Sequence, residues 1–234
     1  MTVKHKEVYE IRGTDILVVD TLILRDSARL VLNPLKKDNF IHAKKIIAGK
    51  GSVIDGKGRT GLRGKVGIHG FSSGGPCRDG TDGQPGSPGD NGRDGVNLLL
   101  YVDELIIEGS LIIDLAGGDG GDGGKGGAGG DGNRGTKLCA GGNGGAGGPG
   151  AAGGNGGRAG NLTFTSKYGT DLRSWMGQRI IVRSYGGFAG QGGDGGLGGQ
   201  RGLGPNKEGD QGKKGLPGTE GTLGKPGGVF FERK

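Results

Sequence analysis

The residues that could do chemistry are few in this sequence and lie far apart. The histidines His5, His42 and His69 show no spacing typical of metal ligands, and Cys77 and Cys139 are the only cysteines. A structural zinc site needs about four such ligands around one ion, so we expect no metal and no other cofactor. Hydrolysis needs a nucleophile, a base and an orienting acid in one pocket, and no such set is evident. We therefore expect a protein that is not an enzyme.

Aspartates within glycine-rich runs raise calcium binding as an alternative. Asp119, Asp122, Asp131 and Asp194 lie in such runs. Calcium-binding nonapeptide repeats need the order G-G-x-G-x-D-x-U-x with an apolar position, and that order is missing. Matches to G-x-G-x-x-G arise by accident in a chain with 63 glycines. None of them opens a helix after a strand, as dinucleotide binding requires.

Glycine dominates the composition, with 63 of 234 residues, whereas hydrophobic residues make up 30%. An average protein has about 7% glycine. The apolar residues are too few for one continuous core, so much of the order has to come from backbone hydrogen bonds. No run of about 18 apolar residues is present, which predicts no membrane span. The charged first residues lack the apolar segment of a signal peptide, so we expect synthesis in the cytoplasm without one.

The positive charge is concentrated near the N-terminus. The net charge of +7 arises within residues 1–75, and the charges of the remaining residues balance. The densest pairs, Lys36–Lys37 and Lys44–Lys45, are candidates for docking on an acidic partner. The alternative is that these lysines are solvated and protect strand edges against aggregation. Aromatic residues do not alternate with them, so we do not expect a nucleic-acid partner.

Glycine recurs at every third position in six separate tracts. A collagen triple helix is one alternative, but it needs about 15–20% proline, and this chain has 8 prolines. Disorder is another, although flexible linkers do not usually keep a strict period. The period favours extended left-handed helices of polyproline II geometry, which have no internal hydrogen bonds and must bond to their neighbours. Tracts 1 to 6 cover residues 58–70, 80–95, 117–135, 141–156, 187–202 and 209–227.

Short connections at 71–79, 136–140 and 203–208 join the tracts in pairs, which predicts three antiparallel hairpins. Tracts 3 and 4 read mostly Gly-Gly-x and have two bare stripes, so we expect them in the interior of a six-helix bundle. Tracts 1, 2 and 6 carry larger residues and suit the periphery, and tract 5 is intermediate. Because Cys77 and Cys139 lie in the first two connections, they would meet at one end and could pair. The missing export signal favours free thiols instead.

Segments rich in leucine and β-branched residues lie between the hairpins and predict short strands. They are expected at 20–24, 30–32, 43–47, 52–55, 103–107, 111–114, 161–166, 179–184 and 229–231. The fold class is therefore mainly β and irregular, with a β-solenoid or sandwich-like base and three hairpins that form a polyglycine II bundle. The chain divides into an N-terminal β base at 1–57, glycine hairpins at 58–95, 117–160 and 187–228, β rungs at 96–116 and 161–186, and a terminal strand at 229–234.

The glycine tracts, Gly-Gly-x runs such as residues 141–146 and the short loops between tracts resemble the polyglycine II domain of tail-fibre tip adhesins from T-even-like phages. They also resemble the six-helix snow flea antifreeze protein. The likeness covers under half the chain and concerns architecture, and this chain differs in having β rungs between its hairpins. A flat ice-binding face needs small uncharged side chains, whereas the outer tracts here carry Arg63, Lys65, Lys213 and Lys214.

In the adhesins, loops at the bundle tip bind the host receptor, so the resemblance implies the same role for the three connections here. An aromatic side chain at a tip also suits ligand binding, which is an independent reason to include Phe71. The implied ligand-binding residues are Phe71, Ser72, Ser73, Arg78, Asp79, Lys137, Leu138, Asn206 and Lys207.

The sequence thus favours a non-enzymatic structural binding module, an adhesin or receptor-binding tip that presents loops on a rigid glycine-rich shaft. Its expected partners are a protein or cell-surface receptor at the tip and a larger assembly at the β base, as in a virion or phage-like particle. The alternative is an intracellular scaffold, interaction protein or protease substrate that docks through its basic β base.

Overall fold

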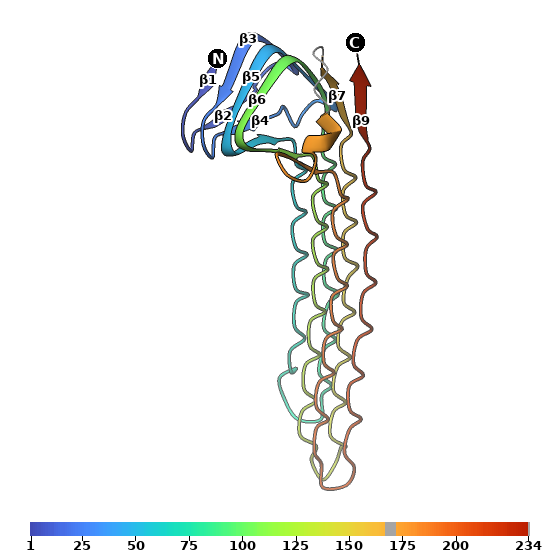
Figure 1. Cartoon of the computed structure of the whole chain (residues 1–234). Helices are drawn as coiled ribbons and strands as arrows, with labels where there is room; N and C mark the ends of the chain where they lie inside the picture. Colours follow the sequence, from blue (N-terminus) through green and yellow to red (C-terminus); the bar gives the residue numbers. More distant parts are fainter. Residues whose placement is uncertain (167–171, 234) are drawn as a thin grey trace.

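The computed structural model describes residues 1–166 and 172–233, and it consists of a β base from which a long, narrow shaft projects (Figure 1). No helix in this described part is long and apolar enough to cross a membrane. One short 3-10 helix, η1 (Leu172–Trp175), accompanies the strands. The strands are β1 (Thr2–Val3), β2 (Val8–Glu10), β3 (Ile16–Leu24), β4 (Arg29–Val31), β5 (Asp38–Asp55), β6 (Asn97–Asp114), β7 (Leu162–Ser166), β8 (Ile180–Arg183) and β9 (Val229–Arg233).

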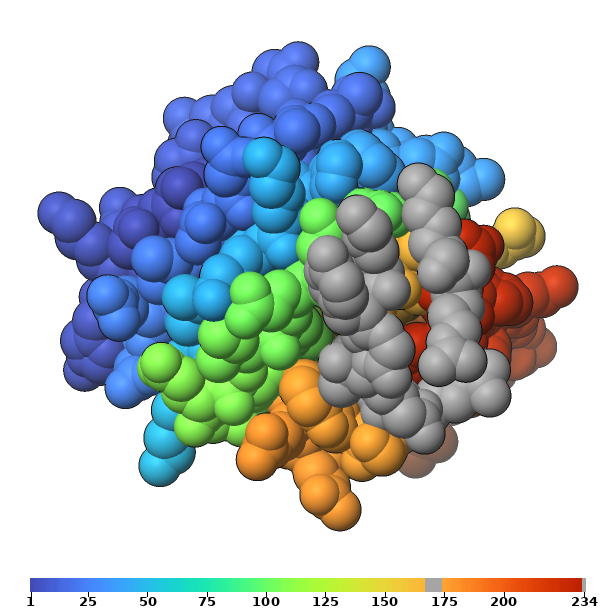
Figure 2. Space-filling model, turned by 45° about the horizontal axis from the view of Figure 1, so that its top comes forward, coloured from blue at the N-terminus to red at the C-terminus, as the bar shows by residue number. Residues whose placement is uncertain are grey.

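All pairings between these strands are parallel. One path runs β1–β3–β5–β6–β7–β9, and further pairings join β2 to β4, β4 to β5 and β6 to β8. The early part of β5 pairs with β3 and its last residues pair with β4, so the chain bends along β5. Its register with β6 shifts between Ala48 and Ser52, where such a bend is expected. Bent segments therefore lie on one another in sequence order, with the N-terminal strands and β9 on opposite sides of the base (Figures 1 and 2).

Side chains at equivalent positions stack across the strands and form the core. Ile41 of β5, Leu100 of β6 and Phe164 of β7 are in register and almost completely buried. Ile54 and Ile113 form a second such row near the ends of β5 and β6. Parallel stacking places apolar residues directly above one another, and each fully buried side chain contributes about 1.5–3 kcal/mol. The hydrophobic core thus belongs to the base.

The strands are longer than the sequence predicts. Separate strands are expected at 43–47 and 52–55, whereas β5 runs through 18 residues, and β6 does the same in place of the two strands expected at 103–107 and 111–114. The early part of β5, which the expected strands leave out, contains a polar residue in the core, Asn39, which is 1% exposed. Its side chain accepts from the Asn33 amide at 2.8 Å and donates to the Asn33 carbonyl at 3.1 Å. A buried asparagine interrupts the apolar alternation from which strands are predicted.

The shaft consists of the six glycine tracts, which lie side by side and bond through their backbones (Figure 1). In tract 3 the amide of Gly120 donates to the Phe188 carbonyl of tract 5, and the next amide, of Gly121, donates to the Asp90 carbonyl of tract 2. This pair of bonds recurs every three residues along the tract. Glycine spacing and hydrogen-bond spacing therefore coincide.

Backbone bonding places tracts 3 and 4 in the interior of the shaft. Tract 3 bonds to tracts 1, 2, 4 and 5, and tract 4 bonds to tracts 2, 3, 5 and 6, whereas tract 1 bonds to tracts 2 and 3 and tract 6 to tracts 4 and 5. The doubled glycines permit this, because a Cβ on Gly123 would meet the Ala151 carbonyl and one on Gly124 would meet the Lys65 carbonyl. The interior place expected for tracts 3 and 4 agrees with this bonding. Tract 2, expected at the periphery, instead bonds to three tracts (1, 3 and 4), as many as tract 5, which bonds to tracts 3, 4 and 6.

The registers of the base continue unchanged into the shaft. Asp38 and Asn97, at the start of β5 and β6, are 59 residues apart, and His69 and Ala128, near the other end of tracts 1 and 3, are also 59 apart. Tracts 2 and 4 keep the offset of 64 that relates β6 to β7. Neighbouring strands lie about 4.8 Å apart, so the base sets the spacing at which the tracts leave it. The second and third hairpins end farthest from the base, and the first connection begins somewhat nearer to it, beside Ala128 of tract 3 (Figure 1).

Candidate functional site

The three connections between paired tracts lie toward the end of the shaft far from the base, the second and third at that end and the first slightly nearer to the base (Figure 1). We call this surface the tip and define it as residues 71–79, 136–140 and 203–208. The tip contains all nine residues that the sequence analysis proposes as ligand-binding. The shaft therefore brings together residues that are far apart in the sequence.

Side chains of neighbouring tracts hold the first connection. The Phe71 amide donates to the Thr81 hydroxyl oxygen at 2.9 Å, and the Thr81 amide donates back to the Phe71 carbonyl at 3.0 Å. Asn133 in tract 3 donates through Nδ2 to the carbonyls of Ser73 and Gly75, the latter at 2.8 Å. The side-chain amide of Asn133 thus holds the middle of the loop through two of its carbonyl oxygens.

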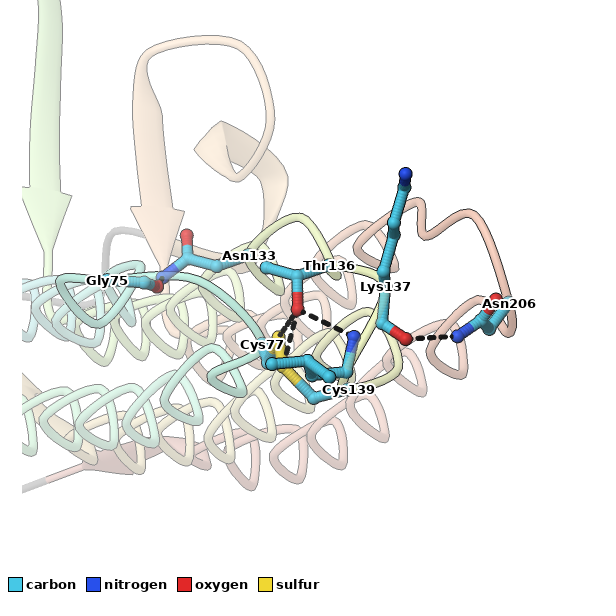
Figure 3. Close-up of a disulfide and its surroundings, with 8 residues drawn as sticks. Gly75, Cys77, Asn133, Thr136, Lys137, Cys139 and Asn206 are labelled. Atoms are coloured by element: carbon cyan, nitrogen blue, oxygen red, sulfur yellow. Dashed lines mark hydrogen bonds between the residues drawn. A yellow bond between two sulfur atoms is a disulfide. The ribbon is translucent and has the colours of Figure 1, made fainter.

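A disulfide joins Cys77 to Cys139 and links the first connection to the second (Figure 3). Their Cα atoms are 6.0 Å apart, within the usual range of disulfides, about 4.4–6.8 Å. The Thr136 hydroxyl lies 3.3 Å from the sulfur of Cys139, and its oxygen accepts the Leu138 amide at 3.2 Å. The Cys77 amide donates to the Arg134 carbonyl at 2.9 Å. Of the two alternatives for the cysteines, the structure has the paired one.

The third connection is bonded to the second. Asn206 donates through Nδ2 to the Lys137 carbonyl at 2.6 Å (Figure 3), and the Gly135 amide donates to the Leu203 carbonyl at 2.8 Å. Between these two bonds lies an open cavity of about 410 Å³. Its lining residues are Arg134, Gly135, Thr136, Lys137, Leu203, Gly204 and Pro205.

The predicted tip residues differ in how much they present to solvent. Leu138 is 97% exposed and Phe71 is 67% exposed. Ser73 is half-buried, and Asp79 uses its carboxylate to accept the Asn143 amide at 2.6 Å. The others are exposed: Ser72, Arg78, Lys137, Asn206 and Lys207. The exposed set therefore combines two large apolar side chains with several cationic and polar ones.

The four lysines proposed for docking do not form one group. Lys36 and Lys37 lie in the turn before β5. Lys44 is seven positions after Lys37 along the strand, about 23 Å away at 3.3 Å per residue. Lys44 pairs with Asp20 at 2.6 Å and Lys45 with Glu104 at 3.0 Å. The hydrogen bond from Lys44 lowers the pKa of the Asp20 carboxyl and raises the pKa of Lys44, and the attraction between the charges acts in the same direction.

The aspartates of tract 3 have a role that the sequence analysis missed. Asp119, Asp122 and Asp131 each accept a backbone amide of tract 5 through Oδ1, at 2.8, 3.0 and 2.7 Å. Asp194 instead pairs with Lys125 at 3.0 Å, and this hydrogen bond lowers the pKa of its carboxyl. The structure shows no cluster of three His, Cys, Asp or Glu residues suited to a metal within residues 1–166 and 172–233.

These side-chain bonds add to the backbone bonds between tracts. In tract 3 the two glycine amides of a triplet donate to neighbouring backbones, and in tract 5 the amide of the residue after the bonded glycine, such as Phe188, donates to an aspartate carboxylate. Asn143 and Asn155 do the same for tract 6, at 2.7 and 2.8 Å. The signal in the sequence is Asp or Asn recurring in the third place of Gly-Gly-x triplets, which indicates a bracket between tracts. We call these residues the Asx brackets.

Comparison with known proteins adds little to this geometry. No protein-family model matches the chain, and no curated protein matches it. Among solved structures, one similar chain is a springtail antifreeze protein from Granisotoma rainieri, described as a nine polyproline type II helical bundle. The match has 26% identity, covers 73% of this chain and 94% of that chain, and has a TM-score of 0.12. A score of this size carries no argument about fold or function.

Proposed function

We propose that the shaft is a six-membered polyglycine II bundle and that the base is a β-solenoid. A polyproline II helix completes a turn in three residues, so bonds that recur every three residues support such helices. Antiparallel bonding within a pair, as from Asp90 to Leu62 and from Arg93 to Arg59, supports hairpins. The parallel pairing of bent strands favours a solenoid over a sandwich, whose sheets are commonly antiparallel.

We further propose that the protein is a non-enzymatic binding module whose tip recognises a protein or a cell-surface receptor. The observation that carries this proposal is Leu138, a large apolar side chain that is 97% exposed on a loop. The loop is held by the disulfide and by Thr136, so the exposure is not a consequence of a loose chain. Rigid, exposed apolar side chains reduce the entropy lost on binding.

In this proposal the base attaches the protein to a larger assembly while the tip binds the receptor. A tail-fibre-like adhesin of a virion or phage-like particle has this arrangement. The shaft separates the two ends, so attachment and recognition do not interfere. In this proposal the disulfide and the Asn133 bonds preserve the shape of the tip after the particle leaves the cell.

Binding to cells tests the role of the tip. We would label the full chain with a fluorophore, incubate it with a panel of intact Gram-negative cells and measure bound label by flow cytometry. The tip variant carries Phe71→Asp and Leu138→Asp, and its matched control carries Leu62→Asp on the shaft, where the side chain is 74% exposed. We expect the tip variant to lose at least about 90% of the binding, since interface energy is concentrated in few residues. Equal binding by both variants would refute the proposal.

A second function, an intracellular scaffold docked through the base, is favoured by one observation. Lys36 and Lys37 are exposed at a turn and form no ion pair among the described residues. Cell fractionation separates the two functions: association with sedimenting particles supports the adhesin, and a stable complex with host proteins in the supernatant supports the scaffold. Lys36→Gln with Lys37→Gln would weaken only the second.

A further inference from the structure

The cavity at the tip presents positive charge without acidic residues in its lining. Arg134 and Lys137 are its charged residues, and both are exposed. Within the described residues no carboxylate lies within ion-pair distance of either. Glu208 is engaged by Arg201 at 3.0 Å, and Asp131 accepts the Gln200 amide at 2.7 Å. The two cations therefore remain available to an anion from outside.

The backbone that carries these cations is fixed from several directions. The Gly135 amide bonds to Leu203 and the Lys137 carbonyl accepts from Asn206, so one hydrogen bond braces each end of the cavity. The Arg134 carbonyl accepts the Cys77 amide, next to the disulfide. Such bracing fixes the backbone from which the two cationic side chains extend. Preorganisation of this kind raises affinity by lowering the cost of ordering the site.

Another part of the lining is apolar. Leu203, which is 58% exposed, and Pro205 belong to it, together with Gly204. A ligand that fits both parts of the lining has an anionic group and a ring with an apolar face. Arginine binds carboxylate or phosphate oxygens through paired N–H donors, and lysine adds a point charge. A sugar ring with an acidic substituent has this combination.

We propose that the cavity between the second and third connections binds an acidic saccharide, with Arg134 and Lys137 on its anionic group and Leu203 and Pro205 against its ring. This inference rests on the proposed function and names the class of its receptor, a cell-surface glycan with carboxylate or phosphate groups. The Asn206 to Lys137 bond joins the third connection to the second, which makes Asn206 a positioning residue.

Immobilised polysaccharides test the inference with the full, oxidised chain. The probes are a polyuronic acid, a phosphorylated mannan and neutral dextran of similar length, and binding is read by biolayer interferometry at about 0.05 and about 0.5 M salt. The site variant is Arg134→Gln with Lys137→Gln, and its control, with the same loss of charge, is Lys213→Gln with Lys214→Gln on tract 6. Thermal melts of both variants verify that the fold is kept.

We expect one or both acidic probes to bind at least about tenfold more tightly than dextran at low salt, and the site variant to lose that difference while the control keeps it. Preference for the polyuronic acid or for the mannan identifies carboxylate or phosphate as the group recognised. Equal binding of dextran, equal losses in both variants, or no binding of either acidic probe would overturn the inference. Cell binding that survives in the site variant but not in the Phe71 and Leu138 variant would overturn it and leave the proposed function intact.

Discussion

At Gly124 the interior of the shaft leaves no room for a methyl group. A Cβ there would meet the carbonyls of Lys65 and Ser87, which belong to two neighbouring tracts. We predict that Gly124→Ala lowers the free energy of unfolding by about 1–3 kcal/mol, as overpacking does elsewhere, measured by urea denaturation. Gly74→Ala is the matched control, because nothing lies within 4 Å of a Cβ at that position. A similar loss in both variants would contradict close packing as the cause.

The Asx brackets make a second prediction for single residues. Replacing Asp119, Asp122 and Asp131 together by Ala removes three acceptors, and we expect a loss of about 0.5–1.5 kcal/mol for each bond. Replacement of the same three by Asn retains Oδ1 and should preserve most of the stability. Chemical denaturation of both triple variants tests this. If the Asn variant is as unstable as the Ala variant, charge rather than hydrogen bonding is responsible.

At the scale of the elements, we expect tract 3 to tolerate a change in its number of residues less well than the other tracts do. Its offset of 59 from tract 1 and its offset of 69 from tract 5 both depend on the number of residues between the base and each bond. One glycine inserted between Gly126 and Gly127 would rotate the residues beyond it, so that Asp131 no longer faces the Gln200 amide. We predict loss of amide protection in hydrogen exchange from the insertion to the tip, with the base unchanged.

An insertion outside the repeat is the control for this experiment. One glycine placed between Lys137 and Leu138 lengthens a connection without altering any tract, and we expect the protection of tract 3 to persist. Loss of protection in both proteins would show that the shaft tolerates no insertion for a reason other than register. Protection retained in both would show that the offsets are not needed.

At the scale of the whole molecule, the disulfide joins two hairpins at the end opposite to their anchorage in the base. Cys77 and Cys139 are separated by 62 residues, and closing a loop of this size contributes about 2–4 kcal/mol by constraining the unfolded chain. We predict that a reductant lowers the free energy of unfolding by this amount. The Cys77→Ser, Cys139→Ser double variant should equal the reduced protein and not respond to the reductant. A response of the double variant would assign the effect to something else.

The base and the shaft depend on different forces in one continuous stack. Rows such as Ile41, Leu100 and Phe164 bury apolar surface in the base, whereas the shaft depends on backbone bonds and brackets. The constant offsets join the two, because each tract leaves the base beside the same neighbours that its strand has. The arrangement of the tracts in the shaft is therefore set by the hydrophobic core of the base, although the shaft itself has no such core.

The sequence by itself determined the features that follow from local period. Glycine at every third position specified the six tracts and their pairing, and Gly-Gly-x triplets specified that tracts 3 and 4 lie inside, because only a bare stripe admits a neighbouring backbone. The leucine-rich segments specified most strands. Each of these rests on residues close together in the chain.

Only the tertiary structure decided the features that depend on partners distant in sequence. The early part of β5 is a strand because it pairs with β3 and β6, where Ile41 lies opposite Leu17 and Leu100. The brackets exist because Asp119 meets an amide 69 residues away, and the cavity exists because Asn206 reaches Lys137. The type of a side chain determines which hydrogen bonds it can make. Which of the many backbone amides it bonds to depends on the register between tracts, and that register is fixed only when all strands and tracts are assembled.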